Sequence, residues 1–159
     1  MKNPRDSLIL VVSKYSPLPG FGANPRWYQL ARRIQAFGYE FEIITSDSNH
    51  GSSRELNTQP VETVSIEQVC YHVIRTAKYR NSNSIARVIS WFDFDLKLFR
   101  HFWQIAPDVV VISSPSLTSI IFGIYLKWRY GSRLVFEVRD IWPLTMIVEG
   151  GFSRWHPLT

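Results

Sequence analysis

The chain has 159 residues, enough for one domain with a sizeable core. Apolar residues make up 45% and charged residues 19%, a balance that is typical of a globular protein and excludes a disordered chain. The net charge of +5 indicates an anionic partner: nucleic acid, lipid headgroups or a phosphorylated substrate. Because the basic residues are scattered and form no arginine-rich arm, nucleic acid is the weakest of these alternatives.

The single cysteine, Cys70, excludes an intrachain disulfide framework and suits a reducing cytosol. It lies in an apolar stretch, which predicts a buried thiol without a chemical role. The histidines are scattered and show no spacing typical of a metal site: His50, His72, His101 and His156. We therefore predict no metal and no cofactor. The first residues lack the apolar run of a signal peptide, so we expect a cytoplasmic protein.

The first informative feature is a strand, a glycine loop and a helix in succession. Residues 7–13 are apolar and predict a buried strand, and residues 26–37 have helical periodicity. Between them lie Gly20 and Gly22. A glycine loop followed by a helix start exposes backbone N–H groups to an anion, typically a phosphate. A loop without any ligand is the alternative.

The start and inner face of this first helix can also be predicted. Asn24 is a favoured N-cap, and Pro25 suits the first helical position. Gly38 is expected to end the helix. One face of the helix is apolar and is expected to pack on the sheet: Trp27, Leu30, Ala31, Ile34 and Phe37.

Further strand and helix signals follow. Residues 39–45 predict a second strand, and at least one of the short apolar runs 61–65 and 68–75 predicts a third. Residues 84–103, with Ser84 as a candidate cap, have the periodicity of a long helix. Its expected inner face is Ile85, Val88, Ile89, Phe92, Leu96, Phe99 and Trp103. Its mixture of aromatic and basic residues also suits a membrane interface.

The stretch from residue 109 to residue 126 carries no charge and is long enough to raise the question of a membrane span. Pro115 and neighbouring serines interrupt it, which favours a buried strand, a turn and a helix that starts at Pro115 and ends at Gly131. Residues 133–138 predict a last strand.

Alternation of strands and helices predicts an α/β fold with a doubly wound, mostly parallel sheet. Ligands in such sheets bind outside the carboxyl ends of the strands. Unusual polar residues stand at those ends: Ser114, Ser116, Arg139 and Asp140. The arginine can bind a phosphate or carboxylate and the aspartate a sugar hydroxyl. Ordinary capping by the serines and an internal ion pair are the alternatives.

The chain resembles the N-terminal half of a GT-B glycosyltransferase, of the family-4 type found among bacterial surface-polysaccharide enzymes. Three segments carry the resemblance. They are Tyr-Ser-Pro-Leu-Pro-Gly-Phe-Gly-Ala-Asn-Pro-Arg at residues 15–26, the run at residues 30–46, and Phe-Glu-Val-Arg-Asp-Ile-Trp-Pro at residues 136–143. The resemblance implies one Rossmann-like domain over residues 1–159, without the C-terminal domain that binds the nucleotide-sugar, and therefore inactive alone.

The resemblance also implies roles for particular residues. Such enzymes transfer a sugar from a nucleotide-sugar, commonly to a lipid-linked acceptor at the inner membrane face. Gly20 and Gly22 would approach the donor diphosphate. The acceptor-side candidates implied by the resemblance are Asn24, Arg26, Arg139 and Asp140, beside the hydroxyls of Ser114 and Ser116. Many family members have a histidine where this chain has Ser113-Ser-Pro, so no catalytic residue can be assigned.

Two other functions stay open. The chain can be a non-catalytic module that binds polyprenyl-phosphate or an anionic membrane through its basic and aromatic residues. It can also be a dinucleotide-dependent oxidoreductase, which Gly20, Gly22 and Asp47 after the second strand favour. Against the oxidoreductase, Pro25 stands where that fingerprint has its third glycine.

Overall fold

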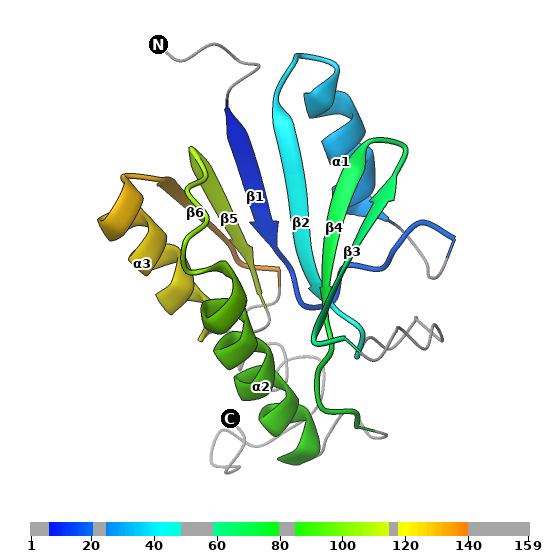
Figure 1. Cartoon of the computed structure of the whole chain (residues 1–159), viewed down its shortest axis with the longest axis vertical. Helices are drawn as coiled ribbons and strands as arrows, with labels where there is room; N and C mark the ends of the chain where they lie inside the picture. Colours follow the sequence, from blue (N-terminus) through cyan, green and yellow to red (C-terminus); the bar gives the residue numbers. More distant parts are fainter. Residues whose placement is uncertain (1–6, 21–24, 49–58, 80–84, 115–117, 140–159) are drawn as a thin grey trace.

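The computed structural model describes residues 7–20, 25–48, 59–79, 85–114 and 118–139. These residues form a sheet flanked by helices on both faces (Figure 1). The strands are β1 (Leu8–Val12), β2 (Glu40–Ser46), β3 (Val61–Ile66), β4 (Val69–Ile74), β5 (Val109–Ser113) and β6 (Arg133–Glu137). The helices are α1 (Arg26–Gln35), α2 (Ile85–Phe102) and α3 (Ser119–Tyr130).

The sheet has the order β3-β4-β2-β1-β5-β6, and every neighbouring pair is parallel except β3 and β4. Both short apolar runs of the sequence are therefore strands, joined as a hairpin at one edge. The hairpin turn places Glu67 and Gln68 at φ of 46° and 72°. Positive φ at both central residues matches the twist of a two-residue hairpin. The predicted doubly wound α/β fold is confirmed.

Each face of the sheet has its own core. The face under α1 buries Val11, Leu18, Trp27, Ala31, Phe41, Ile43, Val69, Tyr71 and Val73. The other face, under α2 and α3, buries Leu10, Val12, Ile44, Ile74, Phe94, Leu98, Phe102, Val110, Ile112, Phe122 and Leu126. Because both faces are covered, the central strands β1 and β5 are almost continuously apolar, as parallel strands require.

The expected inner face of α1 is only partly correct. Trp27 and Ala31 are buried, but Leu30 is 39% exposed and Phe37 is 76% exposed. The helix ends at Gln35, so Phe37 lies beyond the last turn that packs on the sheet. Pro25 also differs from expectation: it occupies the N-cap position before Arg26, without a side-chain cap bond. The predicted N-cap Asn24 lies outside the described residues.

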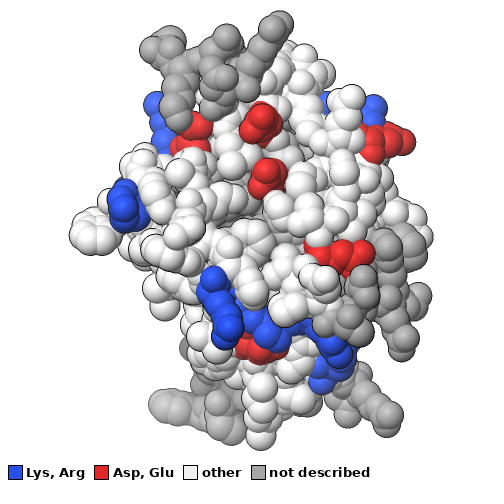
Figure 2. Space-filling view, in the orientation of Figure 1, with Lys and Arg blue, Asp and Glu red and all other residues white. Residues whose placement is uncertain are grey.

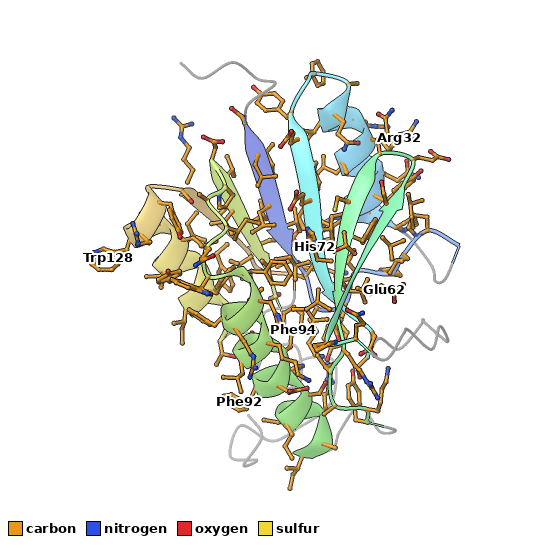
Figure 3. All side chains as sticks on the ribbon, viewed as in Figure 1. Arg32, Glu62, His72, Phe92, Phe94 and Trp128 are labelled. Carbon is orange, nitrogen blue, oxygen red and sulfur yellow. The ribbon has the colours of Figure 1, made fainter. Side chains whose placement is uncertain are left out.

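The expected inner face of α2 is wrong except at Phe99, which packs against the core on this side of the sheet. Phe94 and Leu98 are fully buried, whereas Ile85, Phe92 and Leu96 of the predicted face are 81%, 59% and 71% exposed. Figure 3 shows Phe94 directed toward the sheet and Phe92 directed away from it. The helix has apolar residues on both sides, and the sheet packs against the aromatic stripe that the periodicity argument left out.

The uncharged stretch from residue 109 to residue 126 divides into a strand and a helix, as predicted. Helix α3 begins at Ser119, later than expected, and Pro115 lies outside the described residues. Gly131 ends α3 with φ of 75°, a left-handed conformation that glycine adopts without strain. Among the described helices, none has the length and apolar character needed to span a membrane.

Candidate functional site

The carboxyl ends of the parallel strands meet at one edge of the sheet, which we call the carboxyl edge (Figure 1). There the first residue of α1, Arg26, forms an ion pair with the last residue of β6, Glu137. Because α1 and β6 are far apart in the sequence, only the fold brings these groups together. Arg26 immediately follows the glycine-loop region and Glu137 precedes Arg139, so two sequence-predicted segments meet here.

A set of hydrogen bonds joins the ends of β5 and β6 to this ion pair. The Ser113 hydroxyl donates to Glu137 Oε2 at 2.6 Å. The Ser114 amide donates to the Glu137 carbonyl at 3.0 Å, and the Arg139 amide donates to Ser114 Oγ at 2.9 Å. The predicted residues Arg26, Ser114 and Arg139 are therefore linked through Glu137, which the sequence analysis did not single out.

The environment of Glu137 favours its charged form. Partial burial opposes ionisation, but hydrogen bonds from Ser113 and Arg26 outweigh it and hold the pKa of Glu137 below its ordinary value. The Arg26 side chain is 48% exposed and the Glu137 side chain 22% exposed. A charged pair in this position can still be reached by a ligand.

The remaining predicted site residues have different outcomes. Gly20 is exposed, has φ of 83°, and has open space where a side chain would begin. A glycine at this position therefore suits the left-handed backbone conformation and is not required by close packing. Gly22, Asn24, Ser116 and Asp140 lie outside the described residues. Their roles, and that of Gly20 toward a diphosphate, stay predictions.

A buried lysine, not predicted as a site residue from the sequence, lies at the same edge. Lys14 follows β1 and is only 2% exposed. Its Nζ donates to Ser90 Oγ at 2.9 Å, Ser46 Oγ at 3.3 Å and Thr76 Oγ1 at 3.4 Å. Burial lowers the pKa of Lys14 to about 8, although nearby aspartates, chiefly Asp47, oppose this effect.

An aromatic cluster lies beside this lysine. The Tyr15 hydroxyl accepts hydrogen bonds from Trp91 Nε1 at 2.8 Å and from the Tyr79 hydroxyl at 3.1 Å. The Arg87 guanidinium lies 5.8 Å from the Tyr15 ring centroid and 5.2 Å from that of Trp91. These contacts attach the first half of α2 to the end of β1. A lysine and a tyrosine directly after an apolar strand were the available signal.

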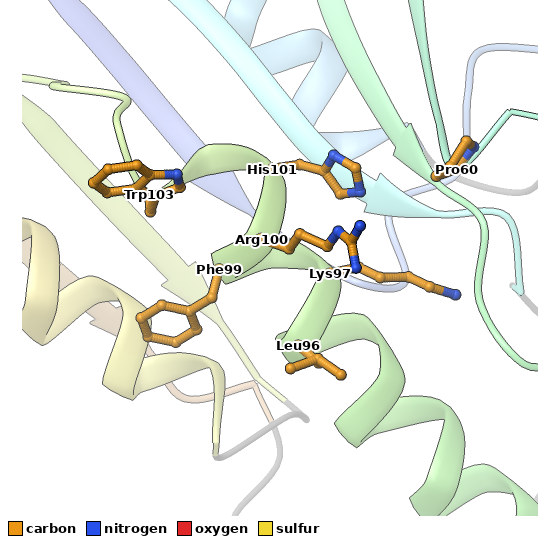
Figure 4. Close-up of a pocket in the computed structure, with 7 residues that line it drawn as sticks. All are labelled: Pro60, Leu96, Lys97, Phe99, Arg100, His101 and Trp103. Atoms are coloured by element: carbon orange, nitrogen blue, oxygen red, sulfur yellow. The ribbon is translucent and has the colours of Figure 1, made fainter.

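A groove lies alongside the second half of α2 (Figure 4). Leu96, Phe99 and Trp103 line it together with Pro60 and the polar residues Lys97, Arg100 and His101. Figure 2 shows that basic side chains gather in a band across the same side of the molecule, over α2. The groove combines apolar walls with positive charge.

The mostly parallel sheet, covered by helices on both faces, defines a Rossmann-like α/β domain. The chain belongs to the glycosyl transferase 4-like domain family, whose model matches residues 21–158. The resemblance inferred from the sequence is thereby confirmed. No curated protein matches the sequence.

Two solved structures are similar in fold. An E. coli protein described as "Trehalose-6-phosphate from E. coli bound with UDP-2-fluoro glucose" has a TM-score of 0.53 at 13% identity. The catalytic domain of starch synthase IV from Arabidopsis thaliana, bound to ADP and acarbose, has a TM-score of 0.50 at 12% identity. Each match covers 82% of this chain, but only 32% of the E. coli protein and 33% of the starch synthase domain. This chain therefore corresponds to about a third of either structure.

Proposed function

We propose that this chain is the acceptor-side domain of a glycosyltransferase that moves a sugar from a nucleotide-sugar to a lipid-linked acceptor in surface-polysaccharide synthesis. Membership of the glycosyl transferase 4-like family supports the reaction class. The two similar structures are complexes with UDP-2-fluoro glucose and with ADP and acarbose, and we extend that kind of ligand to this chain. A nucleotide-binding domain would have to complete the active site.

The Arg26–Glu137 pair at the carboxyl edge is the observation that carries this proposal. It sets a guanidinium and the backbone of Arg139 at the place where ligands of parallel sheets bind. A guanidinium binds phosphate with directed N–H groups, and an ionised carboxylate accepts hydrogen bonds from sugar hydroxyls. In this proposal Arg26 and Arg139 bind the acceptor phosphate, while Gly20 and Gly22 approach the donor diphosphate.

The test is acceptor binding by calorimetry, with a short-chain prenyl diphosphate-linked sugar as the probe and the full chain as the protein. Arg139→Ala and Arg26→Ala should each weaken binding about tenfold or more, since each removes a charge-assisted contact. Arg33→Ala is the matched control, because Arg33 is an exposed arginine in the last turn of α1. Equal losses in all three variants would indicate attraction by net charge alone. No binding by the unaltered chain would refute the acceptor role.

Membrane contact is a second function that we propose, on the basis of the outer faces of α2 and α3. Their exposed apolar residues are Ile85, Val88, Ile89, Phe92, Leu96, Ile121, Ile124 and Trp128. Basic residues accompany them on the same helices: Arg87, Lys97, Arg100, Lys127 and Arg129. Apolar side chains together with positive charge are typical of a surface that lies on anionic lipid. A peripheral position on the inner membrane face would bring the domain to a lipid-linked acceptor.

Vesicle sedimentation tests this surface. The full chain should bind vesicles that contain anionic lipid, and binding should weaken with added salt because the attraction is partly electrostatic. Phe92→Ser and Trp128→Ser should reduce binding, whereas Phe37→Ser should not. Phe37 is a suitable control because it is 76% exposed but follows α1, on the other side of the sheet. Absence of binding at low salt would refute membrane contact and leave the acceptor proposal standing.

A further inference from the structure

Three side chains with metal-binding atoms lie together on the sheet face that α2 covers, two of them near the start of β2 and β4 and the third, His72, in the middle of β4. Cys70 and His72 are two residues apart on β4, so their side chains project from the same face. The parallel register of β2 and β4 pairs Glu42 with Cys70. The cluster therefore arises from strand pairing, which the spacing of the histidines along the sequence does not reveal.

Cys70 also differs from its prediction as a buried thiol, because it is partly exposed. The His72 side chain is 16% exposed and the Glu42 side chain 28% exposed. An ion could thus reach all three groups from solvent without unfolding the sheet. The cluster is neither fully buried nor spread over an open surface.

The spacing of the atoms is close to that of a tetrahedral metal site. His72 Nε2 lies 3.6 Å from Cys70 Sγ and 3.0 Å from Glu42 Oε2. A tetrahedral zinc ion, with bonds of about 2.3 Å to sulfur and about 2.0–2.1 Å to nitrogen and oxygen, separates such ligand atoms by roughly 3.3–3.6 Å. The three ligand atoms all lie within 4.8 Å of one another. Small side-chain rotations would bring them around one ion.

The neighbours of His72 hold its ring in the orientation that such a site needs. Thr63 Oγ1 lies 3.0 Å from His72 Nδ1, so the hydroxyl can accept the proton of that nitrogen. This leaves Nε2, the atom that faces Cys70 and Glu42, as the metal ligand. The Phe102 ring packs edge-on against the imidazole at 5.2 Å between centroids. A hydrogen-bonded second nitrogen and an apolar neighbour are usual around metal-binding histidines.

We propose that Glu42, Cys70 and His72 bind a divalent ion of the zinc class. A thiolate and an imidazole select a borderline-soft transition metal rather than calcium or magnesium, which prefer oxygen ligands. Three protein ligands leave the fourth position for water or an external ligand. Binding displaces the Cys70 thiol proton and any proton that His72 Nε2 shares with Glu42. The bound ion would link β2 to β4 and stabilise the folded domain.

Cobalt(II) is the most informative probe, because its complexes report their ligands by absorption. The full, metal-free chain is titrated with cobalt under reducing conditions and without chelating buffer. We expect saturation at one ion per chain, with a thiolate-to-cobalt charge-transfer band and the intense visible bands of four-coordinate cobalt. Cys70 is the single cysteine of the chain, so any such band must come from it. Added zinc should abolish the bands by displacement.

Variants distinguish a three-ligand metal site from metal binding by the Cys70 thiol alone. Glu42→Gln and His72→Gln should each lower cobalt affinity at least tenfold while keeping the folded circular-dichroism spectrum, and Cys70→Ser should remove the charge-transfer band. His101→Gln, which changes an exposed histidine on α2 outside the cluster, should bind as the unaltered chain does. Zinc should raise the melting temperature of the unaltered chain and of His101→Gln only. No band in the unaltered chain, or a band unaffected by Glu42→Gln and His72→Gln, would overturn the proposal.

Discussion

Helices α1 and α2 cover opposite faces of the same sheet and leave different surfaces outside. α1 buries Trp27 and Ala31 and ends in two exposed arginines, as an ordinary amphipathic helix does. α2 buries Phe94 and Leu98 but still exposes Phe92 and other large apolar residues. The comparison teaches that apolar periodicity locates a core face only when the opposite face is polar. Where a helix carries two apolar stripes, only the assembled fold shows which of them is buried.

The strongest test of this contrast compares two phenylalanines on α2. Phe94→Ala should lower the free energy of unfolding by about 3–5 kcal/mol, because it leaves a cavity in the core. Phe92→Ala should change it by less than about 0.5 kcal/mol, since surface substitutions rarely do more. Urea denaturation measures both. Equal losses in the free energy of unfolding would mean that Phe92 is packed as closely as Phe94, which contradicts the orientation of α2 on the sheet.

The buried lysine beneath α2 predicts a pH dependence. The folded pKa of Lys14 is lowered to about 8, so between pH 8 and the ordinary lysine pKa of 10.5 the unfolded chain binds more protons than the folded chain. Stability should therefore rise with pH in this window, by on the order of 3 kcal/mol for the full shift. The difference in unfolding free energy between the unaltered chain and Lys14→Met isolates this contribution. A pH-independent difference would contradict the charged, desolvated state of Lys14.

Helix α3 lies closer to the sheet than a side chain allows at one position. A Cβ on Gly123 would lie 2.6 Å from Leu134 Cδ1 and 2.8 Å from Ile112 Cγ1. Gly123→Ala should therefore destabilise the domain by about 1–3 kcal/mol through overpacking, despite the better helix propensity of alanine. Thermal melting measures the loss. Ile124→Ala, one residue further along and exposed, should melt close to the unaltered chain.

The smallest effect is expected at the first residue of α1. Arg26→Gln removes the partner of Glu137 at a partly exposed position, and such pairs contribute only about 0.2–1 kcal/mol. The lowered folded pKa of Glu137 adds stability above its unfolded pKa, and this stability is lost as the pH falls. The loss in Arg26→Gln should accordingly be largest near neutral pH and vanish in acid. The Arg26 guanidinium also lies 4.6 Å from the Trp27 ring centroid. Equal losses at neutral and acidic pH would indicate that this packing contributes more to stability than the ion pair.

Much of the fold could be predicted because each strand has a local signal. Residues 109–113 are apolar and end at a serine turn, and β5 lies there. The place of α1 was also predictable, since Gly38 follows it and Trp27 and Ala31 recur at helical spacing. Which face of α2 packs on the sheet could not be predicted, because the helix has two apolar faces. Only the assembled fold shows which of them is buried.

The candidate site was predicted in part for a similar reason. Arg26 and Arg139 stand beside strand or helix ends, which topology assigns to ligands. Their link through Glu137 depends on β5 and β6 being neighbours, which no local pattern specifies. The Cys70–His72 cluster was missed because its third member, Glu42, comes from a strand that pairs with β4 only after folding.

The turn at Glu67 and Gln68 has one more consequence. Glu67 is held by the Tyr28 hydroxyl at 2.6 Å and by Arg32, and Gln35 donates to the Gln68 carbonyl at 2.9 Å. The hairpin of β3 and β4 is therefore attached to α1 by side-chain contacts as well as to β2 by strand pairing. A substitution that changes the rate of amide hydrogen exchange in α1 should therefore change the rate in β3 in the same direction. An Asn-Gly pair in the turn, although better suited to its backbone, would lose the Glu67 carboxylate that Tyr28 and Arg32 contact, and would keep only backbone contacts to α1.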